Sequence, residues 1–122
     1  MKVISVSQVP KAPRTGDALF TGGVVTAQSI IDATMEKAFS ISQVNFAKGA
    51  RNKMHTHSVS QILIVTAGTG IVATETEKAT VRVGDIIFVP AGEKHWHGAT
   101  PDSEFSHIYV IPAGNKTEQV EK

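Results

Sequence analysis

The sequence contains no cysteine among its 122 residues. Disulfide bonds therefore cannot hold the fold together, and a metal site cannot use thiolate ligands. Any bound metal has to be held by nitrogen and oxygen atoms. Cysteine usage leaves the redox compartment of the protein open.

Charge of one sign and long apolar runs are also scarce. Twelve basic and eleven acidic residues give a formal charge of +1, and no run of lysine or arginine could follow a phosphate backbone. We therefore expect no nucleic acid and no membrane as a partner. The opening residues, MKVISVSQVP, lack the apolar run of a signal peptide, and no later stretch is long enough to span a bilayer. The expected location is cytoplasmic.

What the chain does contain is a series of short apolar segments separated by glycine and polar turns. With 41% hydrophobic residues, we expect a single domain over residues 1–122, with its core at about 19–112 and a polar, frayed tail over 113–122. The even spacing of the segments and the near absence of helical periodicity predict an all-β sandwich or barrel. The expected strands are 2–6 at an edge, 19–26 with a bend, 38–46, 61–67, 71–75, 80–83, 86–89 and 105–111; the expected loops are 28–37 and a hairpin turn at 68–70.

Histidines gather in two places along the chain. In an extended strand His55 and His57 point to the same face, and Gln61 returns to that face if the strand stays in register. His95 could complete a set of three imidazoles and one amide oxygen if the later segment folds back beside the first. Such a set leaves coordination positions open on a metal that prefers six ligands, which is typical of a reactive site.

Two motifs with ordered spacing carry a resemblance. The stretch from Gly49 to Gly68, GARNKMHTHSVSQILIVTAG, is similar to the first cupin motif, G-x5-H-x-H-x3-E-x6-G, with Gln61 in place of Glu. The stretch GDIIFVPAGEKH, ending at His95, resembles the second, G-x5-P-x-G-x2-H, although Ala99 replaces the final Asn. This resemblance implies a cupin jelly-roll β-barrel of antiparallel strands. It also implies one divalent metal, bound by His55, His57, Gln61 and His95.

The amide of Gln61 changes what that site would do. Without a carboxylate the bound ion stays more positive, which makes it a better Lewis acid and also holds it less tightly. Nitrogen and oxygen ligands of this kind accept Mn, Fe, Co, Ni, Cu or Zn.

A narrower resemblance rests on HTH-x3-Q, QILIVTAG, GEKHWHGA and the early FTG. These segments are similar to small bacterial cupins that include the manganese-dependent hydroxynitrile lyases, which cleave a cyanohydrin into a carbonyl compound and hydrogen cyanide or run the reverse addition. The resemblance implies a metal-dependent lyase on a small organic substrate, with manganese as the ion. A dioxygenase using the same metal, and a cupin that only binds a small molecule, are the alternatives.

Two further histidines are candidates for moving a proton. His97 shares the parity of His95, and His107 lies between apolar residues of the last expected strand. Either imidazole could accept or return a proton near neutral pH, although each could instead be a hydrogen-bonded structural group. We expect Trp96 to point away from both and Arg51 to be a solvated turn charge. From the resemblance and the expected edge strand at 2–6, we also expect a homodimer or homotetramer.

Overall fold

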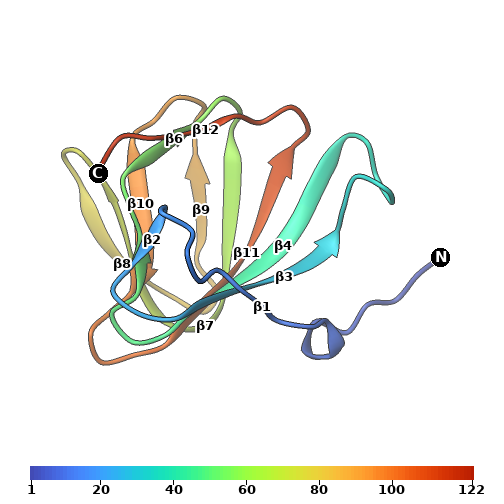
Figure 1. Ribbon diagram of the computed structural model, residues 1–122, viewed down its shortest axis with the longest axis horizontal. Helices are drawn as coiled ribbons and strands as arrows, with labels where there is room; N and C mark the ends of the chain where they lie inside the picture. The colour runs from blue at the N-terminus through green and yellow to red at the C-terminus, as the bar shows by residue number, and fades with distance from the viewer.

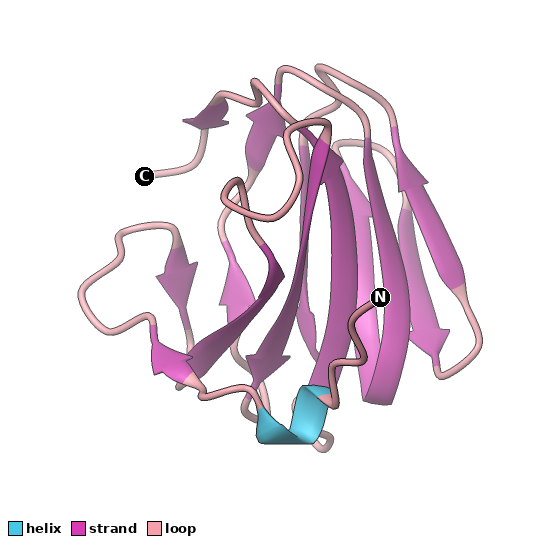
Figure 2. Ribbon diagram, turned by 90° about the vertical axis from the view of Figure 1, so that its right-hand side faces the viewer, coloured by secondary structure: helices cyan, strands magenta, loops and turns pink.

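The computed structural model describes all residues, 1–122, and is built almost entirely of antiparallel strands (Figures 1 and 2). The strands are β1 Ala12–Pro13, β2 Phe20–Thr21, β3 Val25–Ile31, β4 Phe39–Phe46, β5 Arg51–Asn52, β6 His55–His57, β7 Gln61–Thr74, β8 Lys78–Arg82, β9 Ile86–Val89, β10 His95–Ala99, β11 Phe105–Pro112 and β12 Thr117–Gln119. The helical content is one 3-10 turn, Val6–Gln8. No helix is long and apolar enough to cross a membrane. The predicted all-β fold class is confirmed.

The longest strand, β7, connects the two halves of a curled sheet. Its first part pairs with β9 and β11, and its second part pairs with β8 and β10. The main path of pairing runs β1-β3-β4-β11-β7-β10-β5-β2. The sheet therefore curls around a core of small and aromatic residues: Val25, Val44, Phe46, Ala50, Val65, Val81, Ala99 and Phe105.

The expectation of a hairpin turn at residues 68–70 is wrong, because β7 continues through Gly68 and Gly70. The glycines are explained by close packing. A Cβ at Gly70 would lie 2.5 Å from atoms of the Phe105 ring, and Gly68 has a positive φ of 69° where its backbone meets that of Glu104. Glycine here lets the neighbouring chain approach the strand instead of reversing it.

The N-terminal expectations also need correction. Residues 2–6 form no strand, and Val3 is 85% exposed. The expected loop 28–37 begins inside β3. Gln28 is buried in that strand because its Nε2 donates to the carbonyl oxygens of Val6 and Val9, at 2.8 and 2.9 Å.

Of the remaining segments, some follow the prediction and two differ from it. Strands β4, β9 and β11 and the β7–β8 hairpin are confirmed. The expected bent strand 19–26 is instead two strands, β2 and β3, separated by residues 22–24. The tail expected to fray forms β12, which pairs with β6.

Candidate metal centre

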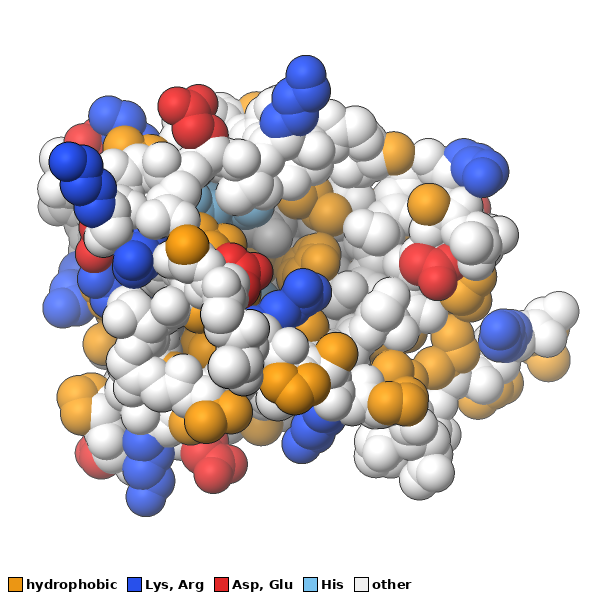
Figure 3. All heavy atoms as spheres, in the orientation of Figure 1, with side chains coloured by type: hydrophobic (Ala, Val, Ile, Leu, Met, Phe, Trp, Pro, Cys, Tyr) orange, Lys and Arg blue, Asp and Glu red, His pale blue; other side chains and the backbone are white.

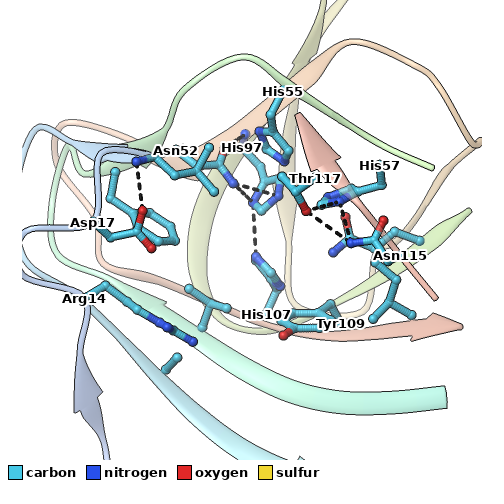
Figure 4. A pocket seen from close by; sticks show the side chains of 16 residues that line it. Arg14, Asp17, Asn52, His55, His57, His97, His107, Tyr109, Asn115 and Thr117 are labelled. Atoms are coloured by element: carbon cyan, nitrogen blue, oxygen red, sulfur yellow. Dashed lines mark hydrogen bonds between the residues drawn. The ribbon is translucent and has the colours of Figure 1, made fainter. Parts of the chain in front are cut away.

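Strands β6, β7 and β10 carry the four ligands predicted from the sequence, of which His55 and His57 are labelled in Figure 4. His55 and His57 lie on β6, Gln61 opens β7, and His95 opens β10, where it lies directly opposite His55. The strand is interrupted at 58–60, so Gln61 reaches the site on a new strand and not by unbroken register. The imidazole centroids are 4.9 Å apart for His55 and His57, 4.3 Å for His55 and His95, and 5.3 Å for His57 and His95.

These side chains hold buried lone pairs without hydrogen-bond partners. Nε2 of His57, Oε1 of Gln61 and Nε2 of His95 are buried and unpaired. Nδ1 of His55 lies 2.6 Å from the Lys53 carbonyl oxygen, and Nδ1 of His95 lies 2.9 Å from that of Glu93. Each Nδ1–H therefore donates to the backbone, which leaves Nε2 as the free nitrogen. Buried lone pairs in this number fit a cation, since polar atoms are seldom buried unpaired.

The third imidazole is held by the C-terminal segment. Nδ1 of His57 lies 3.0 Å from Oγ1 of Thr117, and Nδ2 of Asn115 lies 3.1 Å from the same hydroxyl. Nδ2 of Asn115 also lies 3.3 Å from Nδ1 of His57, which is farther than the hydroxyl. The hydroxyl oxygen can accept both N–H groups, and His57 then keeps its lone pair on Nε2. The sequence reasoning missed Thr117 and Asn115, because the polar composition of the tail carries no strong strand signal.

Burial keeps the imidazoles of this cluster neutral. It lowers the pKa of His55 and of His57 to about 4, and the neighbouring His95 ring adds to both shifts. Burial also lowers the pKa of His95, although the Glu93 carbonyl opposes that shift. The rings therefore carry lone pairs at neutral pH, which is the form that binds a metal ion.

A second grouping of imidazoles shares two members with this set. Ring nitrogens of His55, His95 and His97 lie within 4.8 Å of one another, close enough to hold a metal ion together. The ring of His97 is nevertheless engaged on both sides. Its Nε2 lies 3.0 Å from Nδ2 of Asn52, and its Nδ1 lies 3.1 Å from Nε2 of His107. His57 and Gln61 have free lone pairs and His97 does not, so the first set fits a metal better.

The cluster opens into a cavity of about 230 Å³. His55, His57 and Gln61 line this cavity together with both proton-transfer candidates, His97 and His107, and Figure 3 shows imidazole atoms at the base of a surface hollow. Apolar side chains form much of the wall: Leu19, Phe20, Val44, Tyr109 and Ile111. His95 borders a second cavity, of about 160 Å³, on its other side.

The cavity also contains residues that the sequence did not single out. Arg14 and Asp17 lie at its wall in the first loop, and Asn52 lies deep beside His97 (Figure 4). No sequence motif marks them, because they meet the histidines through strand pairing between distant segments.

The expectation that Arg51 is a solvated turn charge is wrong. Its guanidinium forms two contacts with the Glu121 carboxylate, at 2.6 and 3.1 Å, and lies 4.8 Å from the Trp96 ring centroid. Trp96 is half-buried beneath this cation and does not line the 230 Å³ cavity. Arg51 therefore ties the C-terminal tail to β5 beside β6, the strand with two of the candidate ligands.

Comparison with protein families matches residues 42–111 to the cupin domain. Among curated proteins, (R)-mandelonitrile lyase from Granulicella tundricola is 35% identical over 101 residues, which cover 82% of this chain and 77% of that protein.

Solved structures give the same fold. A cupin-like protein from Thermotoga maritima has a TM-score of 0.85 at 28% identity, covering 93% of this chain and 87% of that one. A polyketide cyclase from Streptomyces resistomycificus has a TM-score of 0.88 at 18% identity, covering 100% and 87%. A predicted oxalate decarboxylase from Thermotoga maritima has a TM-score of 0.80 at 18% identity, covering 91% and 98%. At the identities of the last two, the likeness shows the fold alone.

Proposed function

This chain belongs to the cupin family, and from that premise we propose that it is a metal-dependent lyase of hydroxynitrile lyase type. The observation that carries the proposal is the set of unpaired, buried lone pairs on His57, Gln61 and His95 beside a small cavity. The relative named (R)-mandelonitrile lyase supports the choice of reaction.

His55, His57, Gln61 and His95 would hold one divalent metal ion, and the resemblance makes manganese the expected ion. Bound there, the ion would supply a Lewis acid that polarises a substrate oxygen. The size of the cavity, about 230 Å³, restricts the substrate to a small molecule. Its aromatic and aliphatic walls suit an apolar substituent such as a phenyl ring.

The histidines at the cavity wall would manage the proton. In cyanohydrin cleavage the bond between the carbinol carbon and the nitrile carbon breaks, and its electron pair leaves with cyanide. The electron pair of the O–H bond forms the carbonyl, so the hydroxyl proton has to be accepted and then returned to cyanide. Burial lowers the pKa of His107 to about 4 and that of His97 well below its usual value. Both rings are therefore neutral at pH 7, the form that can accept a proton.

Purified protein incubated with mandelonitrile tests the proposal. Metal content is measured first, followed by cyanide release and oxygen uptake on the same sample. The lyase predicts release of cyanide and benzaldehyde without oxygen consumption. Oxygen uptake would indicate a dioxygenase, whereas neither activity, with tight retention of a small molecule, would indicate a binding protein; both results would contradict the proposal.

The role of His107 gives a sharper test of the mechanism. We expect His107→Ala to lower kcat by about 10²-fold or more, because general acid–base catalysis typically contributes that much. Metal content should stay unchanged, since His107 is not among the proposed ligands. Ser106→Ala is the matched control, because Ser106 precedes His107 on β11 and its hydroxyl donates to Asn45 instead of facing the cavity. Unchanged kcat in His107→Ala would remove His107 from the mechanism.

A further inference from the structure

The side chain of Asn52 hydrogen-bonds to both the backbone and the ring of His97. It lies on β5, is 3% exposed, and its Oδ1 accepts the backbone N–H of His97 at 2.8 Å. Its Nδ2 lies 3.0 Å from Nε2 of the His97 ring. The backbone N–H can meet only the oxygen, so the orientation of the amide is fixed and Nδ2 faces the ring as a donor.

This contact decides where His97 carries its proton. Nε2 accepts from Asn52, so a neutral His97 ring has its proton on Nδ1. That nitrogen lies 3.1 Å from Nε2 of His107 and donates to it (Figure 4). Nε2 of His107 then carries a lone pair, and the proton of the His107 ring lies on Nδ1.

The other contact between these two side chains is longer: Nδ2 of Asn52 lies 3.5 Å from Nδ1 of His97, against 3.0 Å from Nε2. Nδ1 of His107 is buried and has no hydrogen-bond partner. The proton arrangement of His107 is therefore set through His97, and that of His97 is set by Asn52. The order of donation is Asn52 to His97 to His107.

We propose that Asn52 is a positioning residue that keeps Nε2 of His107 free of a proton, so that this atom can take the substrate proton once the substrate hydroxyl displaces the Nδ1–H of His97 from it. This inference rests on the proposed lyase function. Asn52 acts only through His97, and no contact between Asn52 and substrate is required. If the group at position 52 accepted a hydrogen bond from Nε2 of His97, both donations would reverse. Nε2 of His107 would then carry a proton and donate it to Nδ1 of His97.

Asn52→Asp tests the inference, because a carboxylate accepts at both oxygens. One oxygen can accept the His97 backbone N–H and the other a proton on Nε2 of His97, which turns both rings to the opposite tautomer. Nitrogen-15 chemical shifts of the imidazoles report the tautomers directly. They are measured at pH 9 on zinc-loaded protein, because Zn²⁺ is a d¹⁰ ion without unpaired electrons. The wild type should show protonated Nδ1 and bare Nε2 on both His97 and His107, and the variant should show the reverse.

Kinetics with mandelonitrile complete the test. We expect Asn52→Asp to lower kcat by roughly 10²- to 10⁴-fold, the range lost when a catalytic histidine loses its base function or is held in the wrong tautomer, while KM changes by less than about twofold. Asn45→Asp is the control. It makes the same amide-to-carboxylate change on β4, where the side chain of Asn45 donates to Thr26 and Gln28 and forms no hydrogen bond with either imidazole. It should leave tautomers and kcat unchanged.

Asn52→Leu provides a second variant if the aspartate disrupts folding. It removes both hydrogen bonds, so the imidazole shifts should move from single-tautomer values toward an average. Bare Nδ1 on His107 in the wild type, unchanged shifts in Asn52→Leu, or unaltered kcat with reversed tautomers would each overturn the inference. If the wild type itself releases no cyanide, the lyase proposal fails, and the nitrogen shifts still decide whether Asn52 sets the two tautomers.

Discussion

Gln61 places an uncharged amide oxygen beside three neutral imidazoles. Its Oε1 is buried and unpaired, and the four proposed ligands include no carboxylate side chain. A divalent ion held by these groups would keep its full charge. The same feature that would favour polarisation of a substrate oxygen therefore weakens retention of the ion.

Gln61→Glu should strengthen metal binding and weaken the Lewis acidity of the bound ion. A carboxylate adds an attractive charge at the ion, so we expect the dissociation constant for Mn²⁺ to fall by roughly tenfold or more. We expect kcat for mandelonitrile to fall as well, because the ion becomes a weaker Lewis acid. Competition with a chelator measures the affinity, and Gln119→Glu is the control, since Gln119 is exposed on β12. Equal Mn²⁺ affinity in Gln61→Glu would argue against Gln61 as a ligand.

At this scale the sequence predicted which candidate ligands gather, because the spacing of His55, His57, Gln61 and His95 marks them as a set. It could not predict Asn52. The contact between Asn52 and His97 depends on the register of β5 against β10, in which Arg51 pairs with Gly98. That register joins segments more than forty residues apart, since Asn52 and His97 are separated by 45 positions.

Among the elements, β12 has the most direct bearing on the metal centre. It pairs with β6 along its whole length, with Thr117 opposite His57 and Gln119 opposite His55. The Arg51–Glu121 ion pair and the bond from the Met54 backbone N–H to Glu121, 2.8 Å, fasten the segment that follows. The strand that carries two proposed ligands is therefore held in place from the C-terminal side.

Thr117→Val should loosen the metal without unfolding the chain. Valine keeps the shape of threonine and removes the hydroxyl that holds Nδ1 of His57, and losing such a supporting contact typically costs about 10- to 100-fold in metal affinity. Metal titration checks the change. Thr80→Val on the exposed side of β8 is the control and should bind metal as the wild type does. A wild-type affinity in Thr117→Val would show that the hydroxyl does not orient His57.

The polar composition of the tail predicted fraying because composition reports only local preference. Strand β12 is formed by pairing with β6 and by the charge of Arg51, both distant in sequence. The same limit explains β7, where Gly68 and Gly70 indicated a turn and instead give room to the segment at Glu104 and Phe105. Alternating apolar segments such as β4 and β11 were predicted correctly, since their burial pattern is carried by the segment itself.

Considered as a whole, the molecule buries all five of its histidines in neutral form. In the unfolded chain these groups bind protons near pH 6.5, whereas burial lowers the pKa of His55, His57 and His107 to about 4 in the folded state. The unfolded chain therefore binds more protons between about pH 4 and 6.5. Stability must rise with pH through this window and fall on acidification.

The metal-free protein should accordingly lose stability between pH 7.5 and pH 5. His107 alone contributes up to about 3 kcal/mol over the full window, because its shift from 6.5 to about 4 is converted at 1.36 kcal/mol per pKa unit. Urea unfolding at pH 7.5, 6 and 5 measures the effect as a falling midpoint with an unchanged slope. A midpoint that is constant over this range would contradict the assignment of neutral, buried imidazoles.

One outer face of the molecule is apolar. Phe88 and Ile86 on β9 are 64% and 68% exposed, and Ile62 on β7 pairs directly with Phe88. The expected N-terminal edge strand is absent from the chain. We propose instead that a second copy of the chain covers this face as a homodimer, because a twofold contact lets the same patch cover itself.

Phe88→Glu should then give a monomer at concentrations where the wild type is a dimer, since it places a charge in the centre of the apolar contact. Light scattering coupled to size-exclusion chromatography measures the mass of both. Glu118→Lys on the exposed side of β12 changes charge elsewhere and should leave the mass unaltered. A wild-type monomer would refute the proposed dimer, and a tetramer would require a second contact.

The position of β12 has a practical consequence for anyone who handles this protein. Thr117 holds His57, and the segment up to Glu121 is fastened beside β6, whereas Met1 projects away from the barrel at the opposite side of Figure 1. A purification tag or fluorescent fusion joined after Lys122 would pull on the support of an imidazole, and a polyhistidine tag there would place competing ligands near it. The amino end is the safer attachment point.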